Sequence, residues 1–447
     1  ADRNGYDLEY LLELNDEELN QLDRSKLADT PPVELAHFID RLDNEQRRIV
    51  LRLVSDAVAT NILSEMDLEA SAEVVDAMRE PRAVKILEEL DPDDATDLFG
   101  ELEDQKREDL LSQMEPKSAQ EIKELLEYDP DTAGGIMTPD VCSVRDSNSV
   151  DEAIQAIRRQ ASGMETIYYI YVVSSFDELI GVVSMRDLFV ATPSTAITSI
   201  MKEQILGLLT TEIDKEQAAN MMAEYNLIAL PVVNNNNQLV GVVTHDDVID
   251  IIQAEATEDI QKLVGAGADE SIHDDIFYSL KKRHVWLQVN LFTIALASGV
   301  VAFFEEQIAS LTFLAVFMPI IAATGGNAGA QTLAVVIRSL ALEDIHESDK
   351  VKLYLKELFK GIANGMGVGL IGATLAYVWK QDLMTSVVVF TSMMLTMGIS
   401  GFSGAFIPLA LKKLNLDPAQ SSSIFLTTIT DITGFFIFLS LGSWLLL

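Results

Sequence analysis

The chain has 447 residues, which is enough for two to four domains of ordinary size. A formal net charge of −38 argues against a nucleic-acid partner, because binding phosphates needs a basic surface, and it makes cations the natural partners. A hydrophobic fraction of 48% is too high for a disordered acidic chain, so charge and hydrophobicity should occupy different parts of the sequence. Residues 1–275 contain 60 acidic and 21 basic side chains, whereas residues 276–447 contain 10 and 11.

The single cysteine and the first ten residues each indicate one property of the chain. The single cysteine, Cys142, excludes an internal disulfide framework and suits a reducing compartment for the soluble part. The first ten residues, ADRNGYDLEY, have no basic segment followed by an apolar run, so we expect no cleavable secretory signal.

Residues 1–130 are predicted to form an acidic helical domain. Short amphipathic stretches are separated by turns that contain Pro or Asp, as in LDPDDATDLFG at 90–100, and the alternation typical of strands is missing. This spacing predicts short helices stacked into a superhelix. The acids at its turns, including Asp91, Asp93, Asp94 and Asp97, either cap helices or bind cations.

Residues from about 136 to 253 contain an internal repeat. The segments DELIGVVSMRDLFVA (177–191) and NQLVGVVTHDDVIDI (237–251) align without gaps, and each places a Gly in a β-rich run and a Ser or Thr three residues before an Asp. This pattern resembles tandem CBS domains, with the first at 131–198 and the strand core of the second at 199–245. The fold expected for this part is therefore α/β.

The Ser/Thr and Asp of each copy have two interpretations. Ser184 with Asp187, and Thr244 with Asp247, match the signature that caps the start of a helix. Because many CBS domains bind adenine nucleotides, the resemblance also implies that Tyr169, Arg186 and Asp187 could bind ATP as a regulatory ligand. The sequence leaves both readings open.

Residues 246–270 are predicted to be a connecting helix. At 100° per residue, Asp247, Asp250, Glu255 and Glu258 fall within an arc of about 140°. Like charges at this spacing repel one another. Since carboxylate oxygens are the ligands of Mg²⁺ and Ca²⁺, an acidic surface of this kind predicts a divalent-cation sensor whose closed form requires the metal.

Residues 271–447 are predicted to be a transmembrane domain in contact with lipid. It contains five apolar runs, each long enough for the roughly 20 helical residues that span a bilayer. Ten Lys and Arg residues lie in loops on one side, and Lys380 alone lies on the other. This asymmetry predicts a cytoplasmic N-terminal part and an external C-terminus. The predicted spans are 286–306, 311–337, 358–379, 384–411 and 419–446.

Three of these spans carry unusual residues. The second contains PIIAATGGNAGAQT (319–332), which predicts a broken or kinked helix that lines a pore. The third contains GIANGMGVGLIGAT (361–374), where the small residues favour close helix packing. The last contains Asp431 with no basic residue nearby, and an acid inside the membrane indicates a functional site.

The order of these parts resembles the MgtE family of magnesium channels and transporters. The resemblance rests on YDPDTAGGIMTPD (128–140), the CBS pair, AEATEDIQKL (254–263), PIIAATGGNAGAQT and TTITDITG (427–434), and it covers nearly the whole chain. It implies a homodimer in a bacterial-type inner membrane that imports Mg²⁺ along the dimer axis. It also implies a cytoplasmic Mg²⁺ sensor whose connecting helix plugs the pore when Mg²⁺ is abundant.

The resemblance assigns roles to particular residues. The pore acid falls on Asp431, with Thr427 and Asn327 lining the path, and a hydrated Mg²⁺ could lie between two symmetry-related Asp431 carboxylates. Asn226 stands where the family pattern has an acid, which puts a site shared with Asp250 in doubt. The sensor residues implied are Asp91, Asp94, Asp97, Asp214, Glu216, Asp247, Asp250, Glu255, Glu258, Asp259 and Asp417.

Two other classes of function compete with this prediction. A CBS-regulated transporter could carry Co²⁺, Mn²⁺, Ca²⁺ or an anion, although an acidic pore residue argues against anions. An enzyme is disfavoured, because the five His residues are scattered and the sequence has no zinc-protease, phosphate-loop or nucleophile-elbow motif. The predicted architecture is a multidomain membrane protein with an α-helical superhelical N-domain, an α/β CBS pair, a connecting helix and a five-helix transmembrane bundle.

Overall fold

The computed structural model describes residues 14–161, 167, 169–267, 270, 276–342, 345–420 and 422–447. The expectation of no secretory signal concerns residues outside these ranges. The chain divides into two compact units, residues 1–252 and residues 253–447.

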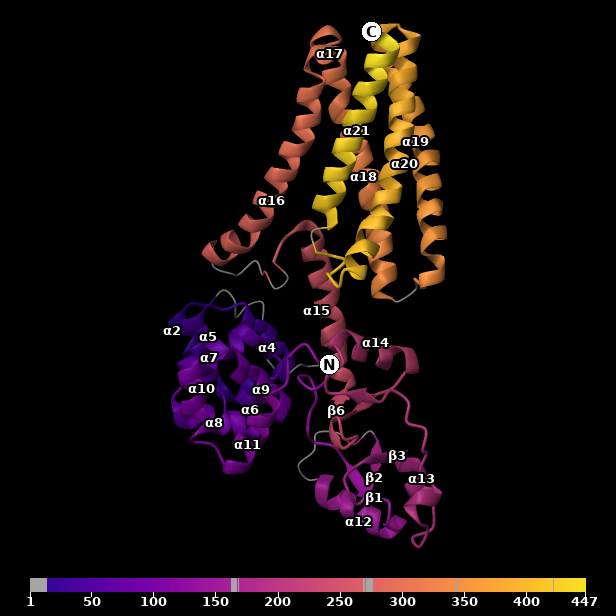
Figure 1. The fold of residues 1–447 in the computed structure, drawn as a ribbon. Helices are drawn as coiled ribbons and strands as arrows, with labels where there is room; N and C mark the ends of the chain where they lie inside the picture. Colours follow the sequence, from indigo (N-terminus) through magenta and orange to yellow (C-terminus); the bar gives the residue numbers. More distant parts are fainter. Residues whose placement is uncertain are drawn as a thin grey trace. The chain divides into compact units, whose positions relative to one another are not determined.

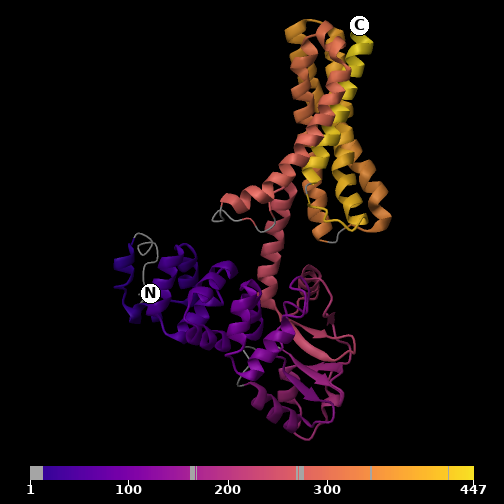
Figure 2. The same ribbon diagram turned by 60° about the vertical axis from the view of Figure 1, so that its left-hand side comes forward.

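The first unit begins with a stack of short helices (Figure 1). From α4 onward, each helix packs on the helix two positions further along, so that α4 contacts α6 and α6 contacts α8, while α5 contacts α7 and α7 contacts α9. Figure 2 shows them following one another in a row. The predicted superhelical stack is confirmed. The helices are α2 (Asp16–Leu19), α3 (Arg24–Ala28), α4 (Pro32–Asp40), α5 (Asn44–Leu53), α6 (Asp56–Leu63), α7 (Leu68–Ala77), α8 (Glu80–Glu89), α9 (Pro92–Glu101), α10 (Asp104–Leu111) and α11 (Pro116–Leu125).

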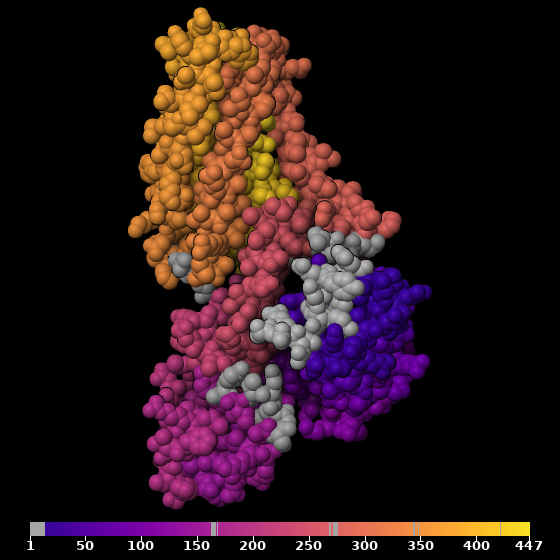
Figure 3. All heavy atoms as spheres, turned by 180° about the vertical axis from the view of Figure 1, so that it is seen from behind, coloured from indigo at the N-terminus to yellow at the C-terminus, as the bar shows by residue number. Residues whose placement is uncertain are grey.

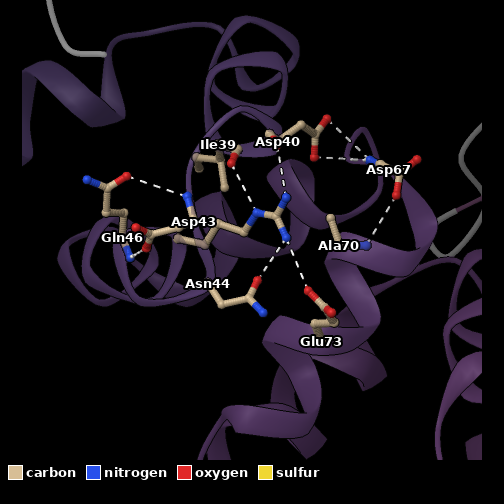
Figure 4. Close-up of polar contacts among 9 residues, drawn as sticks. Ile39, Asp40, Asp43, Asn44, Gln46, Asp67, Ala70 and Glu73 are labelled. Carbon is tan, nitrogen blue, oxygen red and sulfur yellow. Dashed lines mark hydrogen bonds and ion pairs between the residues drawn. The ribbon is translucent and has the colours of Figure 1, made fainter. Parts of the chain in front are cut away.

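Arginine side chains satisfy backbone carbonyls at the ends of these helices. Arg47 donates from Nε to the Ile39 carbonyl (3.3 Å) and from Nη2 to the Asp40 carbonyl (2.9 Å), where α4 ends (Figure 4). Its Nη1 also contacts Glu73 on α7 at 3.2 Å. Arg82 donates to carbonyls at the end of α5, and Arg107 donates to carbonyls at the end of α9. Since the last carbonyls of a helix have no partner within it, these contacts stabilise the short helices.

Two three-stranded sheets follow, one from each copy of the repeat. In each sheet the first strand is parallel to the second, and the second is antiparallel to the third. The strands are β1 (Ser143–Arg145), β2 (Ile170–Val173), β3 (Leu179–Val183), β4 (Leu209–Thr210), β5 (Ala229–Val233) and β6 (Leu239–Thr244), and the helices are α12 (Val150–Gln160), α13 (Met185–Val190), η2 (Ile197–Ser199) and α14 (Lys215–Tyr225).

The two sheets are equivalent at the level of single residues. Gly181 pairs with Val172 and Gly241 pairs with Val232, and each pair is followed by an irregularity in register at the same place. A Cβ on Gly241 would lie 2.7 Å from the Thr138 carbonyl, so only glycine allows this close approach. The predicted tandem CBS architecture is confirmed.

The connecting helix is α15 (His245–Val264). It ends earlier than the predicted boundary at residue 270, because Gly265 adopts a left-handed conformation with φ of 78°. Its first turns belong to the first unit and its remainder to the second.

The described residues of the second unit contain five helices long and apolar enough to span a membrane. They extend beyond the predicted spans at most ends because polar residues continue the helices past the apolar segments. Figure 3 shows part of α21, in yellow, in a hollow between neighbouring helices. The elements are α16 (Ile276–Phe303), α17 (Glu305–Ser310), α18 (Phe313–Ala341), η3 (Glu347–Asp349), α19 (Lys350–Lys380), α20 (Leu383–Lys413) and α21 (Ser422–Leu446).

The second span was predicted to be broken or kinked, and the structure shows no break in it. Helix α18 runs without interruption through Pro319, which lies in its second turn. A proline there removes one backbone hydrogen bond, and the turns on either side keep theirs. The glycines of α18 instead permit close packing, since Gly329 faces Leu426 of α21.

The third span packs closely through glycine, as expected. A Cβ on Gly361 of α19 would lie 2.3 Å from the Met397 carbonyl of α20, and one on Gly365 would lie 2.7 Å from the Cα of Met394. The absence of side chains at these positions allows the two backbones to touch. Helices α19 and α20 therefore form one tightly packed pair.

Candidate cation-binding sites

Asp431 is half-buried on α21 and makes no hydrogen bond or ion pair with any described residue. Thr427 is exposed one turn earlier on the same helix, and its hydroxyl donates to the Ser423 carbonyl at 2.7 Å. A carboxylate that pairs with nothing in its own chain is costly in a membrane unless it faces water, a cation or a second copy.

Asn327 on α18 lies at the same level as Asp431. A Cβ on the neighbouring Gly326 would lie 3.9 Å from the hydroxyl of Thr430, which precedes Asp431. Asn327 is exposed on this single chain, whereas Gly325 and Gly329 on either side of it are buried. The structure therefore brings the three predicted pore residues to one region of helices α18 and α21.

A second acidic group lies in the first unit, where α9 approaches the start of α15. Burial raises the pKa of Asp97 and the pKa of Asp247 to about 6 each, and each group's negative neighbours add to the shift. The hydroxyl of Thr244 donates to Asp247 at 2.5 Å and holds this carboxylate at the helix start.

Asp93 belongs to the same group, although the sensor residues implied by the resemblance omit it. Burial, together with Asp247 and Asp94, raises its pKa well above 3.8, and its Oδ1 is buried without a hydrogen-bond partner in the described structure. Asp93 and Asp97 are four residues apart and share one face of α9, a spacing that could have identified Asp93. Asp91 precedes α9, makes no capping bond, and has a pKa raised by burial and by Asp246.

The raised pKa values predict a contact that depends on pH. Both Asp97 and Asp247 have pKa values of about 6 here against 3.8 ordinarily, so the contact is fully stabilised below pH 4 and weakens as pH rises through 6. Without divalent cations, we expect amide hydrogen exchange in α9, corrected for its intrinsic pH dependence, to accelerate between pH 5 and pH 7. Added Mg²⁺ should reverse this, because cations replace the protons between the carboxylates.

The Asp97→Asn variant is the control for this experiment. It removes one titrating group, so the pH dependence should become shallower. Exchange in α9 that does not change between pH 5 and pH 7 in the unmodified protein would contradict the acidic contact.

The third acidic group lies in the second unit and contains a lysine. Lys262 on α15 forms ion pairs with Glu258 and with Asp417 Oδ2, the latter at 2.8 Å. Burial alone would lower the pKa of Lys262, but its hydrogen bonds to these carboxylates outweigh burial and raise it. Burial and the neighbouring Asp417 raise the pKa of Asp259. Sequence reasoning identified the acids and missed the lysine that links them.

Replacing Lys262 with Met should make this region depend on Mg²⁺. The two carboxylates would lose their shared counter-charge and repel each other, so residues 255–264 should exchange amide hydrogens faster without Mg²⁺ and regain protection when Mg²⁺ is added. Lys262→Arg keeps the charge and should behave like the unmodified protein. Equal exchange in all three proteins would show that Lys262 does not hold these acids together.

The remaining sensor candidates are dispersed. Asp214 caps α14 by accepting from the Glu216 amide at 2.8 Å, and Asp250 is exposed on α15. Asn226 ends α14 in a left-handed conformation with φ of 51°, which explains asparagine at this position, since it tolerates this conformation better than most residues. Glu255 lies half-buried on α15. Within the ranges that the structure describes, no three His, Cys, Asp or Glu side chains already form a metal-binding group.

A cavity of about 30 Å³ lies between the two CBS sheets. Tyr169 lines it together with Asp91, Asp140, Thr244 and Tyr171, but Arg186 and Asp187 do not. Asp187 instead accepts from the Ser184 hydroxyl at 2.7 Å at the start of α13, as the capping reading predicts. The chemistry of Tyr169, Arg186 and Asp187 still suits a ring, a phosphate and a ribose.

The helical stack, the CBS pair and the five apolar helices define a multi-pass membrane protein with an acidic soluble part. Residues 318–441 match the MgtE family, described as divalent cation transporters, residues 30–131 match the MgtE intracellular N domain, and residues 133–193 and 197–254 match CBS domains. The magnesium transporter MgtE of Thermus thermophilus is 36% identical over 430 residues, 95% of each chain. The chain belongs to the MgtE family.

A second relative agrees with this assignment. The magnesium transporter MgtE of Enterococcus faecalis is 35% identical over 73% of this chain and 71% of its own length. A crystal structure of the cytosolic domain of the Mg²⁺ channel MgtE in complex with ATP is 38% identical and covers 54% of this chain and 97% of that one, with a TM-score of 0.49.

Proposed function

We propose that the protein carries Mg²⁺ across a membrane along a path lined by Asp431. The observation that carries the proposal is the half-buried Asp431 carboxylate, which has no counter-charge among the residues that the structure describes and lies level with Asn327 on α18. The two relatives named above are magnesium transporters, and one of them covers almost the whole chain.

The exposure of these residues on one chain supports a homodimer. Asn327 and Thr427 are exposed and Asp431 is half-exposed, so a second copy could complete the path by adding its own Asp431. Mg²⁺ releases its water ligands reluctantly, so two carboxylates would bind the ion through its hydration shell. The ten basic residues near the helix ends on one side support a cytoplasmic N-terminal part and an external C-terminus in a bacterial-type inner membrane.

Regulation by cytoplasmic Mg²⁺ is the second part of the proposal. Asp93, Asp97 and Asp247 repel one another when ionised, and a cation between them would favour the compact arrangement. The other sensor candidates belong to or surround the Asp93–Asp97–Asp247 group and the Lys262 group, or lie elsewhere on the acidic part of the chain. They are Asp91, Asp94, Asp214, Glu216, Asp250, Glu255, Glu258, Asp259 and Asp417. High Mg²⁺ would thereby close the path.

ATP binding remains a separate proposal for Tyr169, Arg186 and Asp187. The exposed position of Arg186 and the ring of Tyr169, which lines the cavity between the sheets, support it.

Transport by the purified chain in liposomes tests the proposal. Mg²⁺ entry should be measured with an internal indicator dye and compared with entry of Co²⁺, Mn²⁺ and Ca²⁺. Entry of Mg²⁺ without comparable entry of Ca²⁺ supports a path for Mg²⁺. Uptake of Co²⁺ or Mn²⁺ without Mg²⁺ would favour the alternative, a transporter for another divalent cation.

A further inference from the structure

Thr396 of α20 lies where three transmembrane helices meet. Its side chain is fully buried. A Cβ on Gly325 of α18 would lie 2.8 Å from Thr396 Cγ2, and a Cβ on Gly434 of α21 would lie 3.1 Å from the same methyl group. The methyl group therefore fills the space that two glycines leave, and it contacts both neighbouring helices.

The position of Thr396 between the two glycines leaves its hydroxyl in an unfavourable environment. Thr396 Oγ1 is buried and has no hydrogen-bond partner within the described structure. Thr391, on the same helix, donates to the carbonyls of Val387 and Val388, as threonines in helices ordinarily do. Since an unsatisfied buried hydroxyl is unfavourable, packing of the methyl group determines the orientation of Thr396.

The two glycines are close in sequence to the residues of the proposed path. Gly325 precedes Asn327 by two residues, and Gly434 follows Asp431 by three, so each lies within one helical turn. Any change in the space occupied by Thr396 would therefore move α18 relative to α21 at the level of Asn327 and Asp431.

We propose that Thr396 is a positioning residue for cation passage, because its methyl group sets the separation of α18 and α21 and thus of Asn327 and Asp431. The proposal rests on the proposed function. It assigns no contact between Thr396 and the cation.

A steric exchange tests this role in the full-length protein in liposomes. Gly325→Ala introduces a methyl group 2.8 Å from Thr396 Cγ2 and should raise the Mg²⁺ concentration for half-maximal uptake, and lower the maximal rate per folded protein, by on the order of tenfold. Thr396→Ser removes Cγ2. The double variant Gly325→Ala/Thr396→Ser should return to within about threefold of the unmodified protein, since a 3.3 Å approach to Ser400 Oγ remains.

Controls separate positioning from folding. Gly367→Ala on α19 adds a methyl group with no heavy atom within 4 Å and should transport normally. Size-exclusion chromatography gives the amount of folded protein, and a folding defect alone would reduce that amount without changing the half-maximal concentration. The proposal is overturned if Gly325→Ala transports normally, if the double variant is no better than Gly325→Ala, or if Gly367→Ala is equally impaired. Absence of Mg²⁺ uptake by the unmodified protein would instead overturn the proposed function.

Discussion

Replacing Asp431 with Asn should reduce Mg²⁺ uptake by at least about a hundredfold. The substitution keeps the size of the side chain and removes its charge. At about 5 Å from a divalent ion and an effective dielectric constant of about 20, that charge contributes several kcal/mol, and each 1.4 kcal/mol corresponds to about tenfold. The protein should remain folded, because the carboxylate has no partner in its own chain among the described residues.

Uptake into liposomes and the elution volume of the purified variant measure these two results. Glu306→Gln on α17 is a suitable control, since it removes an exposed acid of the same transmembrane unit outside the proposed path. Normal uptake by correctly folded Asp431→Asn would exclude Asp431 as the pore acid.

Replacing Asp247 with Asn should make the protein less sensitive to cytoplasmic Mg²⁺. Removing the charge has two opposed effects, because it reduces repulsion with Asp93 and Asp97 and also removes a ligand for the bridging cation. We expect loss of the ligand to dominate. The Mg²⁺ concentration that halves the current should rise by on the order of tenfold, equivalent to about 1.4 kcal/mol of binding free energy.

Recordings from excised patches across a range of internal Mg²⁺ concentrations measure this shift. Glu212→Gln, an exposed acid of the same soluble unit, should leave the response unchanged. Closure of Asp247→Asn at lower Mg²⁺ than the unmodified protein would show that repulsion, and not the loss of a ligand, governs the contact.

The periodic features of the fold were predictable from the sequence. The short helices of the N-terminal stack follow from their Pro and Asp starts, and Gly181 and Gly241 revealed the repeat that forms the two equivalent sheets. These features depend on local propensity and on the alternation of apolar residues, which are visible along the chain. The continuity of α18 through Pro319 was not predictable, because packing of its glycines against neighbouring helices outweighs local propensity.

The candidate sites, like the fold, were predictable from the sequence only in part. The sequence by itself determined that an acid lies in the last membrane span and that the soluble part is strongly acidic, since composition and the length of apolar runs decide both. Only the tertiary structure decided that Asp93 joins Asp97 and Asp247, that Lys262 joins Glu258 and Asp417, and that Thr396 separates Gly325 from Gly434. The physical reason is that electrostatic and steric interactions act over a few ångströms in space, and several of these neighbours are more than a hundred residues apart in the chain.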